Sequence, residues 1–589
     1  MKRRQFLSRA AAGAVAGMAP FVAAAEEPSS VGCETLPKLG PKQVVKNKSS
    51  VCSSSHPLVT QTMIDVLRGG GNAVDAATAG ALMSATVEPH MSNHGGSVIM
   101  LYWDARTSKA YQLESTGSLP SGLAPFRPLP AGLGGFSAPP GRPSMAACIP
   151  GFVPGLAAAH GRFGTKPWAD LCQNAIRWAE EGHPVSSFEF SQLSFDAPYT
   201  TYFPSGRELF TPTGFLPQAG ERFRNPKLAV TLKNLAADGP EYFTKGDWAK
   251  HFVAEANRLG WKIKLENMSA VPPRWVDPLR YRFRDSEIVQ LNLPERTGVL
   301  SAMFLGVMEQ LGIGSLGHYA QSPETLYYMA HALRWVNWEI GMLQDPELFD
   351  APVDLFLSKE KHKLIADTIR RTKPKIDLTE HVRLTSGNVA LAAAGMPTAG
   401  PSTPPASAGS CELSVVDREG NWCQMLNTLA SSGIPGVVID GVPMSGTAAD
   451  WGLDAMFSGF LTGKGRLSFI TGSTFLLRDG RPWLAFGTPG SPHLTVPQML
   501  TNILEFGMEP YEASAAPRFW PLRDNYTLEI ESRVAPGMAD GLARLGIAMK
   551  PLQMHDFHMG SFQISWRDPK TGSLNASADP RRCGKADGI

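Results

Sequence analysis

A hydroxyl and a thiol stand next to each other behind a glycine at Gly409-Ser410-Cys411. A serine hydroxyl in this place is able to attack the carbonyl group of the preceding residue, move the acyl group from nitrogen to oxygen, and let water cut the chain. Gly409 has no Cβ, so its backbone tolerates the strained geometry that this attack needs. The cut would free an α-amino group on Ser410, and its typical pKa of about 7.7–8.0 suits a base for the hydroxyl of the same residue.

The sequence on either side of this junction differs sharply in character. Residues 395–409 are rich in Pro, Ala, Gly and Ser and poor in apolar side chains, so we expect a mobile linker that packs badly. Strands are predicted at 413–417 and 422–429, joined by a turn at 418–421. An autocatalytic cleavage would be sited where such a linker meets a strand. A plain linker with a surface serine fits the same residues, and the residues by themselves favour that simpler interpretation.

Elements that would position this junction are predicted along the rest of the chain. Apolar residues at helical spacing, with an N-cap at Asn72, predict helices at 59–68 and 73–87. Trp335 and Trp338 are predicted core residues of a helix. Further helical segments are predicted at 166–184, 226–260, 324–343 and 359–371. Strands are predicted at 98–103, 473–477 and 483–486, and an irregular loop is predicted at 119–144.

Composition narrows the class of protein. The chain has 589 residues, of which 43% are apolar and 18% charged, so it has ample material for a globular core. Its formal net charge is +2 without a concentrated basic stripe, which argues against nucleic acid as a partner. Internal apolar runs fall short of the roughly 18 residues of a spanning helix, which argues against a polytopic membrane protein.

The N-terminus reads as an export signal. Residues 1–25 combine a basic start at Arg3-Arg4, an uncharged stretch and a small-residue cleavage site at Ala23-Ala24-Ala25, similar to twin-arginine signals of bacteria. We therefore expect a periplasmic mature protein. Among the seven cysteines an odd one must stay unpaired in that compartment, and Cys33 and Cys52 are a possible pair.

Several stretches resemble the gamma-glutamyltranspeptidase family, in order from about residue 40 to the C-terminus. They are Gly70–Ala77, Val87–His90 with Gly95-Gly96, Pro150-Gly151, Gly161–Gly164, Asp238–Pro240, Gln344–Pro346, Leu413–Asp417, Thr428-Leu429, Gly487–Gly490 and Ala578–Arg581. The resemblance implies an α+β fold of the N-terminal-nucleophile hydrolase type, a four-layer αββα sandwich in one large intertwined domain. It also implies a precursor that cuts itself into a large chain, 26–409, and a small chain, 410–589.

The resemblance assigns roles to individual residues. The nucleophile, which is Thr in the family, falls on Ser410, and the threonine that supports it falls on Thr428. The backbone N–H groups of the family's oxyanion hole fall on Gly490 and Ser491. Cys411 is the alternative nucleophile if the register slips by one residue. The resemblance implies no cofactor and no metal.

The predicted substrate pocket departs from the family pattern. The acidic residue that holds the substrate amine falls on Asp450, and Glu114 is a second substrate-binding candidate. The arginine that binds the glutamyl carboxylate falls on Leu113, which lacks the bidentate guanidinium that a carboxylate prefers. Three more contacts differ, at Glu412, Ala430 and Ser468-Phe469, and Arg466 or His493 are residues able to compensate.

Three functions remain open from the sequence. The first is an exported, self-processing hydrolase and acyltransferase for glutathione-like γ-glutamyl amides, with the two subunits of one precursor as partners. The second is an acylase for another small amide. The third is a non-catalytic binding relative that keeps the fold. A metal site at His90 and His94, four residues apart, is set aside because the sequence between them breaks and no HExxH motif is present.

Overall fold

The computed structural model describes residues 36–119, 148–259, 262–341, 343, 345–347, 349–371, 409–429, 436–444, 465–466, 470–521 and 527–589. The chain divides into a short N-terminal unit, Met1–Leu36, and a large unit, Pro37–Ile589, which holds the elements named below. The predicted signal peptide at 1–25, the linker at 395–408 and nearly all of the loop at 119–144 lie outside the described residues.

Two seven-stranded antiparallel sheets form the centre of the large unit. In spatial order, the first sheet holds β1 (Val45–Lys48), β22 (Leu574–Ala578), β21 (Gln563–Arg567), β17 (Arg481–Gly487), β16 (Thr474–Arg478), β10 (Ser286–Gln290) and β9 (Leu279–Phe283). The second holds β23 (Lys585–Gly588), β2 (Val51–Ser54), β11 (Cys411–Val416), β12 (Trp422–Thr428), β3 (Ser97–Asp104), β4 (Lys109–Ser115) and β8 (Arg274–Val276).

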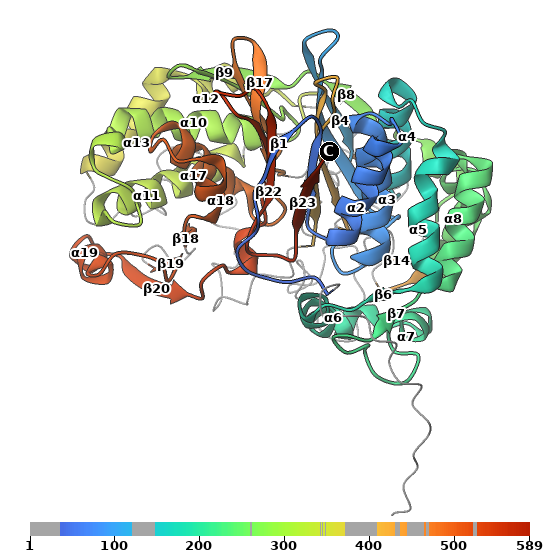
Figure 1. Ribbon diagram of the computed structural model, residues 1–589. Helices are drawn as coiled ribbons and strands as arrows, with labels where there is room; N and C mark the ends of the chain where they lie inside the picture. The colour runs from blue at the N-terminus through green and yellow to red at the C-terminus, as the bar shows by residue number, and fades with distance from the viewer. Residues whose placement is uncertain are drawn as a thin grey trace, which may run out of the picture. The chain divides into compact units, whose positions relative to one another are not determined.

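Helices cover the outer face of each sheet (Figure 1). Directly on the second sheet pack α2 (Pro57–Arg68), α3 (Ala73–Val87) and α4 (Phe152–Phe163), and the same core is completed by α5 (Trp168–Glu181), α8 (Pro226–Asp238) and α9 (Asp247–Arg258). On the first sheet packs α10 (Thr297–Leu311), and against α10 pack α11 (Pro323–Ile340), α13 (Lys359–Arg371) and α17 (Pro492–Leu504). The predicted four-layer αββα sandwich is confirmed.

The inner strands β3, β11 and β12 of the second sheet are buried on both faces along their whole length. In β3 every residue is buried. Met100 and Tyr102 face the helices, whereas Ile99, Leu101 and Trp103 alternate with them and pack between the two sheets against Val289, Phe475 and Ala485. Shorter elements among the described residues are β5 (Ser118–Leu119), β6 (His183–Pro184), β7 (Arg222–Phe223), β13 (Val438–Ile439), β14 (Val442–Pro443), β15 (Gly465–Arg466), β18 (Phe519–Pro521), β19 (Thr527–Glu531), β20 (Ala548–Leu552), α6 (Ser187–Thr200), α7 (Pro204–Phe210), α12 (Val353–Phe356), α18 (Pro510–Ala515), α19 (Met538–Arg544) and 3-10 turns at 240–243, 265–269, 313–315 and 557–559.

Most of the predicted elements that fall on described residues are present with small shifts at their ends, but the segment predicted as helical at 226–260 is two helices, α8 and α9, with a 3-10 turn between them. The N-cap at Asn72 is confirmed: its side chain accepts hydrogen bonds from Val74 N and Asp75 N, and Asp75 accepts one from Asn72 N in return. Trp335 is buried as predicted, but the prediction for Trp338 is wrong because 51% of its surface is exposed. Helical spacing alone does not tell a core face from its edge.

The described cysteines form no disulfide, and the described helices are too short or too polar to cross a membrane. Cys52, Cys148, Cys172, Cys411, Cys423 and Cys583 are all free and buried, so Cys52 is a core thiol and not half of a disulfide. Cys33 lies outside the described residues. Among the described helices, none combines the length and the apolar character needed to span a bilayer.

Candidate active site

Ser410 immediately precedes β11, an inner strand of the second sheet. Cys411 pairs with Asn427 on the antiparallel neighbour β12, so one step back along β11 places Ser410 opposite Thr428. Ser410 and Gly409 are half-buried, whereas Thr428 is buried. The sheet register therefore brings together two hydroxyls that are 18 residues apart in the sequence.

A chain of hydrogen bonds joins these hydroxyls to the carbonyl group of the bond that would be cut. Ser410 Oγ donates to Thr428 Oγ1 over 2.9 Å, and Thr428 Oγ1 donates to the carbonyl oxygen of Gly409 over 2.7 Å. Ser410 Oγ also contacts that same oxygen. Each hydroxyl has a single proton, so Ser410 directs its proton to Thr428 and Thr428 directs its own to the Gly409 carbonyl oxygen. The Ser410 oxygen therefore lies beside a carbonyl group that Thr428 polarises.

The glycine before the nucleophile is required by packing and not by a left-handed backbone. A Cβ on Gly409 would lie 2.9 Å from Leu429 Cγ and 3.0 Å from its two methyl carbons. Such contacts are closer than a side chain tolerates, so a larger residue would push the scissile peptide away from Thr428. The sequence predicted the glycine's importance, but this crowding by Leu429 became visible only in the fold.

Cys411, the alternative nucleophile, points to the opposite side of the strand. Its Sγ donates to Glu88 Oε2 over 3.3 Å and packs with Met91, Phe188 and Cys583. Burial raises the pKa of the Cys411 thiol well above its usual value, because the thiolate is disfavoured away from water. A buried thiol held in its protonated form does not suit a nucleophile.

Glu412 faces the first sheet, beside the end of β17. Its Oε1 accepts a hydrogen bond from Ser473 Oγ over 3.1 Å. A Cβ on Gly487, the last residue of β17, would collide with this carboxyl group. Burial raises the pKa of Glu412 to about 8, so it is protonated at neutral pH.

The predicted oxyanion hole lies in the loop that follows Gly487. Gly490 and Ser491 both have left-handed backbones, with φ of 69° and 49°, and Ser491 is the N-cap of α17. Backbone N–H groups at a helix N-terminus favour negative charge. Because β17 ends against Glu412, this loop leaves the sheet at the end where Ser410 begins β11.

Leu113 and Glu114 occupy opposite faces of β4. Leu113 is fully buried in the core between the second sheet and its helices, so a side chain at this position points away from the space between the sheets. Glu114 accepts hydrogen bonds from Gln112 Nε2 over 2.7 Å and from Arg274 Nη2 over 3.2 Å. Burial raises the pKa of Glu114 to about 7, against the opposing effect of Arg274.

Sequence reasoning missed the charged groups that surround Glu114. Arg274 also pairs with Asp345 and Glu347. Glu295 accepts hydrogen bonds from Thr297 and Thr471, and burial raises its pKa to about 8, with the neighbouring Glu114 adding to the rise. These residues follow no motif, and only the fold brings them together.

Other predicted residues fall partly outside the description. Asp450, Ala430, Ser468 and Phe469 lie outside the described residues. Arg466 donates from Nη1 to the carbonyl oxygen of Pro272 over 2.6 Å. His493 is in the first turn of α17, and its carbonyl oxygen accepts a hydrogen bond from Asn337 Nδ2.

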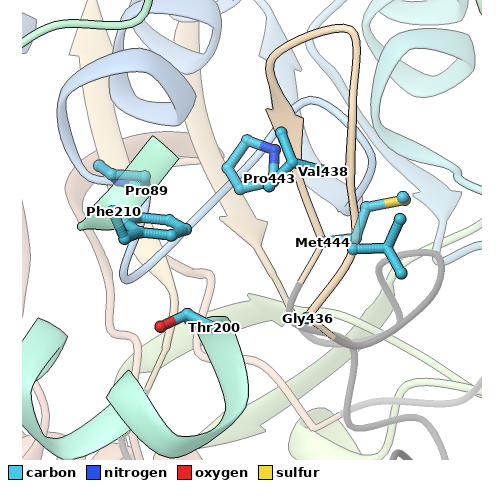
Figure 2. A pocket seen from close by; sticks show the side chains of 8 residues that line it. Pro89, Thr200, Phe210, Gly436, Val438, Pro443 and Met444 are labelled. Atoms are coloured by element: carbon cyan, nitrogen blue, oxygen red, sulfur yellow. The ribbon is translucent and has the colours of Figure 1, made fainter. Parts of the chain in front are cut away.

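Metal-binding groups and a small hollow are two other features of the described residues that bear on a functional site. No group of three or more His, Cys, Asp or Glu residues among these residues is arranged to hold a metal ion. Figure 2 shows a hollow lined by Pro89, Thr200, Phe210, Gly436, Val437, Val438, Pro443 and Met444. Thr200 supplies its one polar side chain, and the Thr200 hydroxyl donates to the carbonyl oxygen of Asp196 over 3.2 Å.

Comparison with known proteins decides the family. Residues 59–589 match the model of the family described as gamma-glutamyltranspeptidase. The chain belongs to this family. Its members are enzymes, and the resemblance seen in the sequence is confirmed.

Curated relatives include enzymes with different substrates in their names. The chain is 28% identical to a glutathione hydrolase proenzyme of Pseudomonas aeruginosa, over 88% of this chain and 90% of that protein. It is 26% identical to an oxamate amidohydrolase proenzyme of Klebsiella pneumoniae, over 90% of this chain and 97% of that protein. The crystal structure of a cephalosporin acylase from Bacillus halodurans shares the fold, with a TM-score of 0.75, 22% identity, and coverage of 95% and 99%.

Proposed function

We propose that this family member is a self-processing amidohydrolase and acyltransferase with Ser410 as its nucleophile. One observation carries the proposal: the hydrogen bonds from Ser410 Oγ to Thr428 Oγ1 and from Thr428 Oγ1 to the carbonyl oxygen of Gly409. They prepare both partners of one reaction, the attacking oxygen and the carbonyl group. The proenzyme names of the relatives support it.

Self-cleavage would proceed in two steps, an acyl shift from nitrogen to oxygen and then hydrolysis of the ester. Ser410 Oγ forms a bond to the Gly409 carbonyl carbon, the bond from that carbon to the Ser410 nitrogen breaks, and the Oγ proton ends on the freed nitrogen. Thr428 donates its hydrogen bond to the oxygen on which negative charge develops. Water then adds to the ester, which leaves a carboxyl group on Gly409 and restores the Ser410 hydroxyl.

Turnover of a substrate would repeat this chemistry with an external amide. The free α-amino group of Ser410 takes the proton from its own hydroxyl, and Oγ attacks the amide carbonyl. The leaving amine receives that proton, and water or another amine then takes the acyl group from Ser410. Gly490 and Ser491 would donate backbone N–H groups to the oxyanion.

The acyl group is a γ-glutamyl group or that of another small amide. Glutathione-like compounds are the first candidates, given the name of the Pseudomonas aeruginosa relative. The geometry of β4 supports another small amide as the alternative. Leu113 points into the core between the sheet and its helices, and Arg274 already pairs with three carboxylates, so neither would bind the carboxylate of a glutamyl group. Asp450 and Glu114 remain proposed contacts of the substrate.

Export is part of the same proposal. A signal at 1–25 would direct the precursor to the periplasm, and cleavage would yield subunits of 26–409 and 410–589. Both subunits would stay together, because β11 from the small subunit lies between β2 and β12, and β2 comes from the large one.

A covalent trap tests the function directly. Purified protein is mixed with glutathione, a γ-glutamyl anilide, oxamate and a panel of acyl anilides, and is quenched in acid before mass spectrometry. We expect one acyl group on the peptide that begins with Ser410, and none in a Ser410→Ala variant. Acylation by other amides but never by γ-glutamyl compounds would select the second candidate. A processed protein that no amide acylates would overturn the function.

A further inference from the structure

Arg582 contacts the nucleophile residue from the far end of the chain. Its Nη1 donates to the carbonyl oxygen of Ser410 over 2.8 Å. The side chain is 1% exposed, with its guanidinium 5.9 Å from the centre of the Phe188 ring and Nη1 3.7 Å from Met91 Sδ. The buried guanidinium of Arg582 is therefore bound to the same residue whose nitrogen cleavage would free.

The preceding arginine holds this contact in place. Arg581 Nε and Nη2 donate to the two carboxylate oxygens of Glu531 over 2.7 and 2.6 Å, and Nη1 donates to Asp579 Oδ1 over 3.2 Å. Arg518 pairs with the same Asp579. The turn after β22 is thus clamped by Arg581, while its neighbour Arg582 reaches the strand that carries Ser410.

Most other titratable groups around Ser410 are shifted toward their neutral forms, whereas Arg518 and Arg581 outweigh burial and lower the pKa of Asp579. Glu412 has a pKa raised to about 8 by burial, and burial holds the pKa of His90 well below its usual value. Burial likewise raises the pKa of Cys411 and that of Glu88, which accepts hydrogen bonds from Ser55, Ser84 and Cys411. Cys583 has its pKa raised to about 11, and the carboxylate of Asp579 is engaged by Arg518 and Arg581.

We propose that Arg582 is a positioning residue for the N-terminal nucleophile: it fixes the Ser410 carbonyl group and, after cleavage, keeps the freed α-amino group unprotonated. The inference rests on the proposed function. A second positive charge so close to the guanidinium is disfavoured, because like charges within a few ångströms oppose ionisation. The amine is then a free base at neutral pH, ready for the proton of its own hydroxyl.

Charge and geometry are separated by three variants. Arg582→Gln keeps an N–H donor for the Ser410 carbonyl oxygen but removes the charge, and Arg582→Lys keeps the charge but loses the planar fork. Lys585→Gln is the matched control, because it removes one positive charge from the exposed side chain of the same C-terminal segment. The readout is the pH profile of kcat/KM on whichever amide turns over.

The sign of the expected shift follows from the role of the amine as a base. Loss of the guanidinium lets the amine hold its proton to higher pH, so the acidic limb in Arg582→Gln moves up by about one pH unit. Arg582→Lys keeps the limb of the wild type with a lower kcat, and Lys585→Gln matches the wild type in both. A limb that stays in place in a folded, processed Arg582→Gln overturns the inference.

A measurement on the wild type covers the case in which Arg582→Gln does not fold. The rate at which an anhydride acylates the Ser410 α-amino group, followed by mass spectrometry across pH, gives the pKa of that amine. We expect a value below the ordinary range of about 7.7–8.0, and a value inside or above that range overturns the inference. A wild type that never exposes this amine overturns the proposed function itself, whereas an ordinary amine in an active enzyme overturns this inference alone.

Discussion

Two buried glutamates at opposite ends of one row of cross-strand pairs in the second sheet have different surroundings. The row runs from Glu412 on β11 through Leu426 and Ile99 to Glu114 on β4. Glu412, next to the nucleophile, meets a hydroxyl and stays protonated at neutral pH. Glu114 meets Arg274 and forms part of a charged network. The sheet thus leaves the acidic side chain beside Ser410 without a cation and places the acidic side chains that pair with an arginine three strands away.

The largest effect is expected at the β11 end, where two adjacent residues face opposite ways. Ser410→Ala should abolish cleavage and lower amide turnover by about 10⁴-fold or more, because it removes the attacking oxygen. Cys411→Ala is the matched variant on the other face, and it should still be cleaved. Electrophoresis under denaturing conditions reports both. Normal cleavage in Ser410→Ala, or loss of cleavage in a folded Cys411→Ala, would show that Ser410 is not the nucleophile.

Thr428 sharpens the β11 side of the comparison. Thr428→Ala removes the hydroxyl that polarises the Gly409 carbonyl group, and we expect self-cleavage to slow by about 10²–10³-fold. Thr428→Ser keeps the hydroxyl and should retain most of the rate. The time course of fragment appearance in purified precursor measures this, and equal rates for the Ala and Ser variants would exclude the proposed role.

The β4 end should respond in stability and not in cleavage. Arg274→Met leaves Glu114 buried without its cation, so we expect a loss of about 3 kcal/mol in the free energy of unfolding. Arg280→Met breaks the more exposed pair with Glu287 and should cost less than about 1 kcal/mol. Urea unfolding compares the two. Similar losses, or failed processing in a folded Arg274→Met, would remove the distinction between the two ends.

The last effect concerns the pH dependence of stability. The pKa of Glu412 is about 8 in the folded protein against an ordinary 4.5, so the folded state binds one more proton between these values. Stability should therefore fall as pH rises through this window, by about 1.4 kcal/mol per pH unit from this group. Glu412→Gln should flatten that slope in unfolding measured from pH 5 to 8. An unchanged slope would mean that Glu412 is ionised beside Ser410.

The hairpin at the β11 end was predictable because its signals are local. The strands expected at 413–417 and 422–429, with a turn at 418–421, match β11 and β12, whereas Ser410 and Thr428 were assigned from the family resemblance. The register of the two strands then sets Ser410 opposite Thr428. The helix after Asn72 was equally local. These parts of the fold and the site depend on neighbours in sequence.

The β4 end was not predictable, since its contacts depend on which face a side chain takes. The expected departure at Leu113 concerned the substrate, yet the fold directs Leu113 into the helix-side core and leaves Glu114 on the inner face. Arg274 and Arg582 come from segments far away in sequence, 160 and 172 residues from their partners Glu114 and Ser410. Contacts of this kind follow from the packing of whole sheets.

The central claim, that the peptide bond between Gly409 and Ser410 is cut by Ser410 itself, is tested most directly by mass spectrometry of the purified wild-type chain. We predict a small fragment whose first residue is Ser410 and a large fragment that ends at Gly409, formed without added protease and absent from Ser410→Ala. A chain that stays whole at this bond, or one cut at another residue, would contradict it.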